Sequence, residues 1–131
     1  MGRRATGPFE VKLNPQSAYN ADPAAMVARM SIDKQFHGDL EATSKGEMLT
    51  AGSGVKGSAA YVAIERVTGN LGGRTGSFAL QHTGIMSRGA PSLVITVVPD
   101  SGVDGLEGLT GTMSIEIING KHSYVLDYDL A

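Results

Sequence analysis

The sequence predicts an all-β protein, a single antiparallel barrel of about eight strands with little or no helix. Apolar and polar residues alternate along most of the chain, which is the pattern of half-buried strands. Glycine accounts for 18 of the 131 residues, about twice its usual share, and indicates many tight turns. The dipeptide Asn119-Gly120 lies between two apolar runs and is a strong hairpin signal.

The expected strands are the segments in which apolar residues recur at every second position. They cover residues 9–13, 30–36, 40–42, 58–68, 75–86, 91–98, 109–118 and 121–130. Asp22 followed by Pro23 is a typical helix start, so we expect at most one helical turn there. No linker or shift in composition divides the chain, and we therefore expect one domain over residues 1–131.

The hairpin at Asn119-Gly120 sets the register of the last two strands. A two-residue type I′ turn pairs Ile118 with Lys121. Every second residue of each strand then shares one face, which is mostly apolar and is expected to face the interior. This face carries Met113, Ile115, Ile117, His122, Tyr124, Leu126 and Tyr128.

A second hairpin is expected to turn through the glycine-rich residues 69–76. A loop of even length pairs Glu65 with Phe78 or, one step further, with Leu80, and both pairings place the same residues on the interior face. A bulge at one of the glycines would make the loop odd and would reverse the faces. With an even loop, the interior face includes three polar residues, Tyr61, Glu65 and His82.

These three residues are the candidates for chemistry. A carboxylate and an imidazole on one apolar face are typical of a general acid–base pair, so Glu65 or His82 could act as a base and Tyr61 as a hydrogen-bond donor. The alternative is structural. Glu65 then pairs with Arg66 or Arg74 at the rim of the barrel, and His82 is a hydrogen-bonded core residue.

Three functions remain open at this point. The barrel binds a small apolar molecule, or it is a cofactor-free cyclase or isomerase, or it is an oligomer with a filled interior that acts through its outer surface. In the first case, the residues expected to contact the ligand are Tyr61, Glu65, Phe78, Leu80, His82, Met113, Ile115, Tyr124 and Tyr128.

Several other classes of function are disfavoured. The chain has 11 basic and 13 acidic residues, which is not the basic footprint of a nucleic-acid-binding protein. It has no cysteine, and His37, His82 and His122 lie on separate predicted segments, so no metal site is expected. Residues 52–57 match G-x-G-x-x-G, but no buried strand precedes them and no helix follows. We therefore expect a hairpin loop there and no cofactor.

Localisation and assembly can be predicted from the apolar segments. The longest one, residues 93–98, is far too short to cross a bilayer, and no signal peptide is evident. We therefore expect a cytoplasmic protein that does not contact membranes. Val62, Ile64 and Ile85 lie on the outer face of the central strands, and this apolar surface predicts a homo-oligomer.

Six segments of the chain occur in an order that resembles a bacterial protein family, the domain of unknown function 3224. They read Y-V-A-I-E-R-V-T-G at 61–69, L-G-G-R-T-G-S-F at 71–78, L-Q-H-T-G at 80–84, V-P-D-S-G at 98–102, L-E-G-L-T-G at 106–111 and L-D-Y at 126–128. The likeness extends from about Gly7 to Leu130, and the chain departs from it at residues 14–27, a variable loop.

The resemblance implies an allene oxide cyclase-like fold, in which eight antiparallel strands close around a small cavity. The family has no assigned activity, so the resemblance implies the fold strongly and says hardly anything about the function. A cavity for a small apolar molecule is implied only by analogy at the level of the fold.

Overall fold

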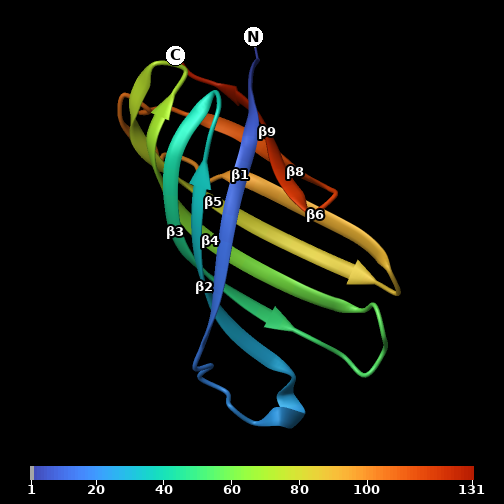
Figure 1. Cartoon of the computed structure of the whole chain (residues 1–131). Helices are drawn as coiled ribbons and strands as arrows, with labels where there is room; N and C mark the ends of the chain where they lie inside the picture. Colours follow the sequence, from blue (N-terminus) through green and yellow to red (C-terminus); the bar gives the residue numbers. More distant parts are fainter. Residues whose placement is uncertain (1) are drawn as a thin grey trace.

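The computed structural model describes residues 2–131, so Met1, the first residue of the expected domain, lies outside the described residues. The described part contains nine strands and a three-residue 3₁₀ helix, Pro23–Ala25, at the predicted position (Figure 1). The strands are β1 (Arg3–Gln16), β2 (Val27–Phe36), β3 (Leu40–Ala51), β4 (Ala59–Leu71), β5 (Arg74–Ser87), β6 (Ala90–Val97), β7 (Val103–Asp104), β8 (Thr110–Ile118) and β9 (Lys121–Asp129). No helix within residues 2–131 is long and apolar enough to span a bilayer.

Eight strands form a closed antiparallel barrel, which confirms the predicted fold class. Neighbouring strands pair in the order β4-β3-β2-β1-β9-β8-β6-β5, and a pairing between β5 and β4 closes the ring. The short β7 pairs with the first residues of β5. Both ends of the chain lie at one end of the barrel (Figure 1), which we call the terminal end. The opposite end is called the distal end.

Both predicted hairpins form, and their registers are fixed by glycine. Gly72 and Gly73 make a two-residue turn between β4 and β5, and both have positive φ angles, 58° and 94°. Glu65 therefore pairs with Leu80, the second of the two predicted even registers. Asn119 and Gly120, with φ angles of 52° and 76°, make the type I′ turn between β8 and β9.

Two strands extend much further than the alternation of apolar residues predicts. β1 begins at Arg3 instead of residue 9, because its first seven residues pair with β9. β3 runs to Ala51 instead of ending at residue 42. The added residues of β3 are mostly polar, but β2 and β4 pair with them on both sides and satisfy their backbone hydrogen bonds.

The apolar core fills the barrel toward the terminal end. Its fully buried side chains include Phe36, Leu40, Leu71, Phe78, Leu80 and Leu126. The segment that connects β7 to β8 closes this end with Leu106 and Leu109, which are both buried. The Tyr124 hydroxyl holds the turn between β2 and β3, since it donates to the carbonyl oxygen of His37 at 2.7 Å and accepts from the N–H of Leu40 at 2.9 Å.

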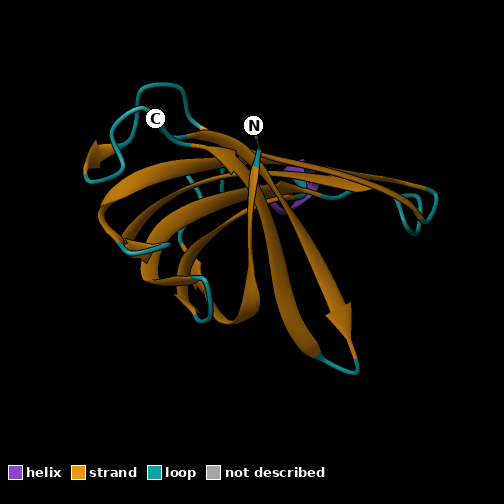
Figure 2. Ribbon diagram, turned by 90° about the horizontal axis from the view of Figure 1, so that it is seen from above, coloured by secondary structure: helices purple, strands orange, loops and turns teal. Residues whose placement is uncertain are grey.

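The wall of the barrel is weakly joined near the distal end. β6 and β8 share only two register pairs, Ile95 with Met113 and Thr96 with Thr112. Each of the other seven joins in the ring has at least seven pairs. The hairpins at the distal end consequently point in different directions (Figure 2), and the barrel widens there.

Candidate functional site

Five polar side chains form a diagonal line across the inner face of four neighbouring strands. Lys34 on β2 is paired in register with Ser44 on β3. Glu65 on β4 and His82 on β5 are diagonal neighbours, because Glu65 pairs with Leu80, two residues before His82. Tyr61 lies on β4 four residues before Glu65, nearer the distal end. Diagonal neighbours on one face of an antiparallel sheet are within reach of long side chains. The alternation of the four strands thus brings these groups together.

Two glycines make room for the larger side chains of this line. Gly46 pairs with Glu65 across β3 and β4, and a Cβ atom at Gly46 would lie 2.7 Å from the Cβ of Glu65. Gly84 pairs with Tyr61, and a Cβ atom there would lie 2.3 Å from Cε1 of the tyrosine ring. The Tyr61 ring therefore packs directly over the backbone of Gly84, where any other residue would displace it.

Glu65 is the centre of the cluster and is fully buried. Its Oε2 atom accepts hydrogen bonds from Lys34 Nζ at 2.7 Å and from His82 Nε2 at 2.5 Å. Its Oε1 atom accepts one from Ser44 Oγ at 2.7 Å. His82 Nδ1 in turn faces the Tyr61 hydroxyl at 3.4 Å. We call these five residues the buried polar cluster.

The environment of Glu65 keeps its carboxyl group ionised. Burial alone would raise its pKa, but hydrogen bonds from His82, Lys34 and Ser44, together with the Lys34 charge, lower the pKa of Glu65 to about 2. Burial and the nearby Glu65 charge raise the pKa of Tyr61. The cluster therefore contains a carboxylate and a protonated tyrosine at neutral pH.

Lys34 and Ser44 were not predicted as site residues, although a signal for Lys34 is present in the sequence. Lys34 has the same parity as Ile32 and Phe36, which are buried on β2. Its side chain is only 5% exposed, and its ammonium group lies 5.3 Å from the centre of the Phe9 ring and 5.6 Å from that of Phe36. A buried ammonium group needs a buried anion, so this parity implied a partner for Glu65.

The structural alternative, in which Glu65 pairs with Arg66 or Arg74 at the rim, is wrong about the partner of Glu65. Arg66 lies on the outer face of β4, as its parity requires, and donates to Ser77 Oγ and to the carbonyl oxygen of Ser101. Arg74 donates to the carbonyl oxygen of Ala131. The cation that neutralises Glu65 comes from β2 instead, which is distant in sequence but adjacent to β3 in the barrel.

The six apolar or aromatic residues predicted to contact a ligand all lie on the inner face of the barrel. Five are buried in the core and Ile115 is partly buried against it. They are Phe78, Leu80, Met113, Ile115, Tyr124 and Tyr128. They pack with other core residues, whereas only Tyr61, Glu65 and His82 of the predicted set meet in the buried polar cluster. Ile117, predicted to be interior, is 62% exposed because the hairpin of β8 and β9 extends beyond the core.

A pocket of about 480 Å³ lies at the distal end, where the inner face continues beyond the closed part of the barrel. We call it the Tyr61 pocket. Its walls come from β3, β4, β5 and β6, and none of the described residues that line it has a charged side chain. The walls are formed by Met48, Thr50, Ala51, Gly52, Ala59, Ala60, Tyr61, Gly84, Ile85, Met86, Pro91, Ser92 and Leu93.

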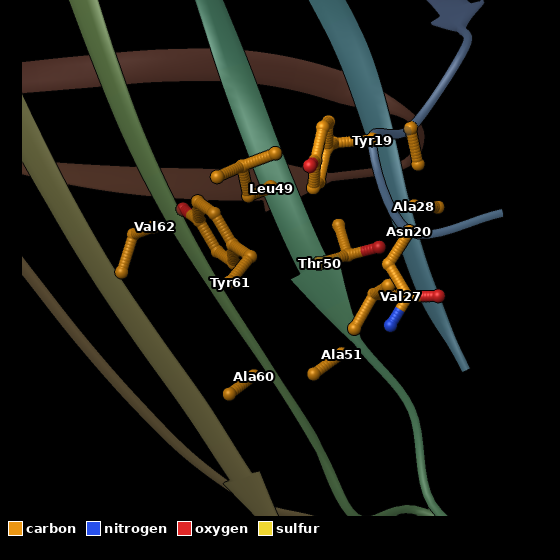
Figure 3. Close-up of a pocket in the computed structure, with 11 residues that line it drawn as sticks. Tyr19, Asn20, Val27, Ala28, Leu49, Thr50, Ala51, Ala60, Tyr61 and Val62 are labelled. Atoms are coloured by element: carbon orange, nitrogen blue, oxygen red, sulfur yellow. The ribbon is translucent and has the colours of Figure 1, made fainter. Parts of the chain in front are cut away.

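A second pocket of about 430 Å³ adjoins the first and also reaches Tyr61. Figure 3 shows it, with Tyr19 and Asn20 of the segment between β1 and β2 opposite Val62 of β4. Beside it runs an apolar surface that we call the outer stripe. The stripe consists of Leu49, Val62, Ile64, Ile85 and Val94, each between 50% and 57% exposed.

The other motifs considered in the sequence occupy ordinary structural positions. Residues 52–58 form the connection between β3 and β4, as predicted for a hairpin loop. His37 lies at the surface between Glu10 and Glu41, and His122 stacks edge-on against Phe9. Among residues 2–131, no group of three or more histidine or carboxylate side chains is arranged to hold a metal ion.

Comparison with known proteins supports the resemblance inferred from the six sequence segments. Residues 5–128 match the model of a family described as protein of unknown function (DUF3224). A crystal structure of a protein with unknown function from the DUF3224 family of Shewanella oneidensis MR-1 shares 50% sequence identity with this chain. The two align over 100% of this chain and 99% of that chain, with a TM-score of 0.94. A search of curated proteins gives no match.

Proposed function

Because this chain belongs to the DUF3224 family, whose description assigns no activity, we propose its function from the geometry of its own site. The barrel binds a small, neutral and largely apolar molecule in the Tyr61 pocket, with the Tyr61 hydroxyl as the polar anchor. One observation carries this proposal. Tyr61 lines the apolar pocket and is also a member of the buried polar cluster, in which it contacts His82.

The size and lining of the pocket suit such a ligand. A volume of about 480 Å³ lies in the range of small-molecule sites, about 300–1,000 Å³, which are mostly apolar with a few placed polar groups. The lining residues with polar side chains are Tyr61, Thr50 and Ser92, each of which carries a hydroxyl group. A charged ligand would find no counter-ion among the lining residues and would lose its hydration shell on entry.

The buried polar cluster supports a functional role for this end of the barrel. Two buried charges are costly to remove from water, and well-packed apolar residues often stabilise a core as well or better. The Lys34–Glu65 pair is therefore poorly explained by stability alone. Its consequence for the pocket is to fix His82, and His82 in turn faces the hydroxyl of Tyr61.

Binding is a better account of this site than acid–base catalysis by Glu65. A general base must reach the substrate and must have a pKa near the working pH. Glu65 is fully buried, accepts three hydrogen bonds and has a pKa of about 2. Its carboxylate thus orients other groups and does not remove protons from a substrate at neutral pH.

A fluorescence titration tests the proposal. N-phenyl-1-naphthylamine is a neutral apolar probe that brightens when it leaves water, and it should bind the wild-type chain with one saturable site. Ala59→Phe fills the pocket from its wall and should weaken binding by about tenfold or more. Thr112→Phe places the same side chain on the exposed outer face of β8 and should leave binding unchanged.

Two results would contradict the proposal. One is the absence of saturable binding by the wild-type chain. The other is equal binding by wild type and Ala59→Phe, which would place the probe elsewhere, for example on the outer stripe. Circular dichroism of each variant shows whether the barrel itself is retained.

A further inference from the structure

We infer that Tyr61 offers the pocket a hydrogen-bond acceptor and not a donor, so that the ligand carries a hydroxyl or N–H group at the end that meets Tyr61. This inference rests on the proposed function, because it specifies the chemistry of the molecule that the Tyr61 pocket takes. The chain of contacts from Lys34 to Tyr61 supplies the reasons.

The first step is the direction of the hydrogen bond between His82 and Glu65. An ionised carboxylate has no proton and can only accept. Glu65 accepts from Ser44, Lys34 and His82, so Nε2 of His82 carries a hydrogen and donates it. The carboxylate thereby fixes which ring nitrogen of His82 holds the proton.

The second step is the charge of the cluster. The carboxylate of Glu65 is neutralised by the ammonium group of Lys34 at 2.7 Å. A second cation on His82 would leave one uncompensated positive charge in a site where Lys34, Glu65 and His82 are all at most 8% exposed, and such a charge is strongly unfavourable. His82 is therefore neutral, and Nδ1 has a free lone pair.

The third step is the proton of Tyr61. The lone pair of His82 Nδ1 faces the Tyr61 hydroxyl at 3.4 Å, a long contact in which only the tyrosine can donate. A tyrosine hydroxyl has a single hydrogen and two acceptor positions. When the hydrogen points to His82, the acceptor positions remain for a ligand in the pocket.

The Tyr61 ring is held in this arrangement by the backbone of β5, the strand that also carries His82. It packs over Gly84, which also lines the pocket, so the ring cannot sink further toward β5. A ligand alcohol, phenol or N–H group can donate to the hydroxyl oxygen without disturbing the contact with His82. A ketone or ether of the same size could bond to Tyr61 only if the tyrosine gave up its bond to His82.

Competition among matched probes tests this inference. 2-Naphthol, 2-methoxynaphthalene and 2-acetylnaphthalene share one ring system, but only 2-naphthol has a hydrogen to donate. Each is used to displace N-phenyl-1-naphthylamine from the wild-type chain and from Tyr61→Phe. In the wild-type chain, 2-naphthol should bind about tenfold more tightly than the other two, as expected for one additional hydrogen bond.

Tyr61→Phe keeps the ring over Gly84 and removes only the hydroxyl. The preference for 2-naphthol should fall to about twofold or less in this variant, while the affinity for 2-methoxynaphthalene should stay within about twofold of wild type. Ala59→Phe should weaken all three probes equally, because it reduces the space and leaves the hydroxyl in place.

The outcomes separate the inference from the proposed function. If none of the three probes displaces N-phenyl-1-naphthylamine from the wild-type chain, the proposed function is wrong. If they displace it with equal affinities, or if 2-acetylnaphthalene is preferred and the preference requires Tyr61, the pocket binds ligands but Tyr61 is not an acceptor. A preference for 2-naphthol that persists in Tyr61→Phe would also overturn the inference.

Discussion

The ion pair between Lys34 and Glu65 predicts a specific dependence of stability on pH, and Glu65→Gln is the substitution that exposes it. Glutamine has almost the same shape, so the packing against Gly46 and His82 is retained while the charge is lost. The pKa of Glu65 is about 2 in the folded chain and 4.5 ordinarily. This difference corresponds to about 3 kcal/mol of folding free energy.

The sign follows from the direction of the shift. A carboxyl group whose pKa is lowered on folding stabilises the folded state above its ordinary pKa, and this contribution is lost as the pH falls toward the folded value. Glu65→Gln lacks the contribution at every pH and leaves the Lys34 ammonium group buried without a counter-ion. We therefore expect the variant to be less stable by about 3–5 kcal/mol at neutral pH.

The two proteins should approach each other in stability as the pH is lowered. Urea unfolding followed by circular dichroism at neutral pH and at several values between about 5 and 2 measures the difference. In this range the wild-type chain should lose about 3 kcal/mol more than the variant. Glu107→Gln, at an exposed position, is the control and should follow the wild-type curve. A gap between wild type and Glu65→Gln that does not change with pH would refute the reasoning.

Three further predictions concern the rest of the barrel. Tyr124→Phe leaves the buried N–H of Leu40 without its acceptor and should lower the unfolding free energy by about 1–3 kcal/mol, whereas Tyr19→Phe, at a fully exposed position, should have no effect on thermal unfolding. The hydrogen bond to Glu10 raises the pKa of His37 above 6.5, so Glu10→Gln should lower the midpoint of the His37 titration measured by NMR. An unchanged His37 midpoint would count against that contact. The outer stripe predicts self-association, so light scattering should give a mass above that of the monomer. Replacing two residues of the stripe by serine should reduce that mass, and a wild-type monomer at high concentration would contradict the prediction.

Much of the barrel could be predicted because its registers are set locally. Two-residue turns at Gly72-Gly73 and Asn119-Gly120 fix the pairing of the flanking strands, and a side-chain period of two carries this information along each strand. The same alternation placed Tyr61, Glu65 and His82 on one face. No knowledge of distant segments was needed for these conclusions.

The partner of Glu65 could not be identified in the same way. Which cation reaches a buried carboxylate depends on how β2, β3 and β4 align side by side, and two arginines lay closer in sequence than Lys34. The polar second half of β3 was missed for a related reason. Its residues have weak strand propensity of their own and become a strand because neighbours pair on both sides.

The position of the Tyr61 pocket also could not be predicted from the alternation of apolar and polar residues. The pocket exists because β3 to β6 continue past the part of the barrel that closes, and the closure is set by the short join of β6 to β8. Ile117 illustrates the same effect. Its parity was predicted correctly, but it lies on a hairpin that has left the core, so it is exposed.

Where β6 and β8 separate, each strand has a backbone edge that no other strand within residues 2–131 covers. Such edges are templates on which other chains can add strands and aggregate. Pro91 on β6 has no N–H to offer a new strand, and Glu116 places a charge on the edge of β8. These are two of the devices by which natural sheets prevent edge-to-edge growth. The open edges at the distal end are therefore protected against polymerisation by Pro91, which also lines the Tyr61 pocket, and by Glu116, which lies outside that pocket.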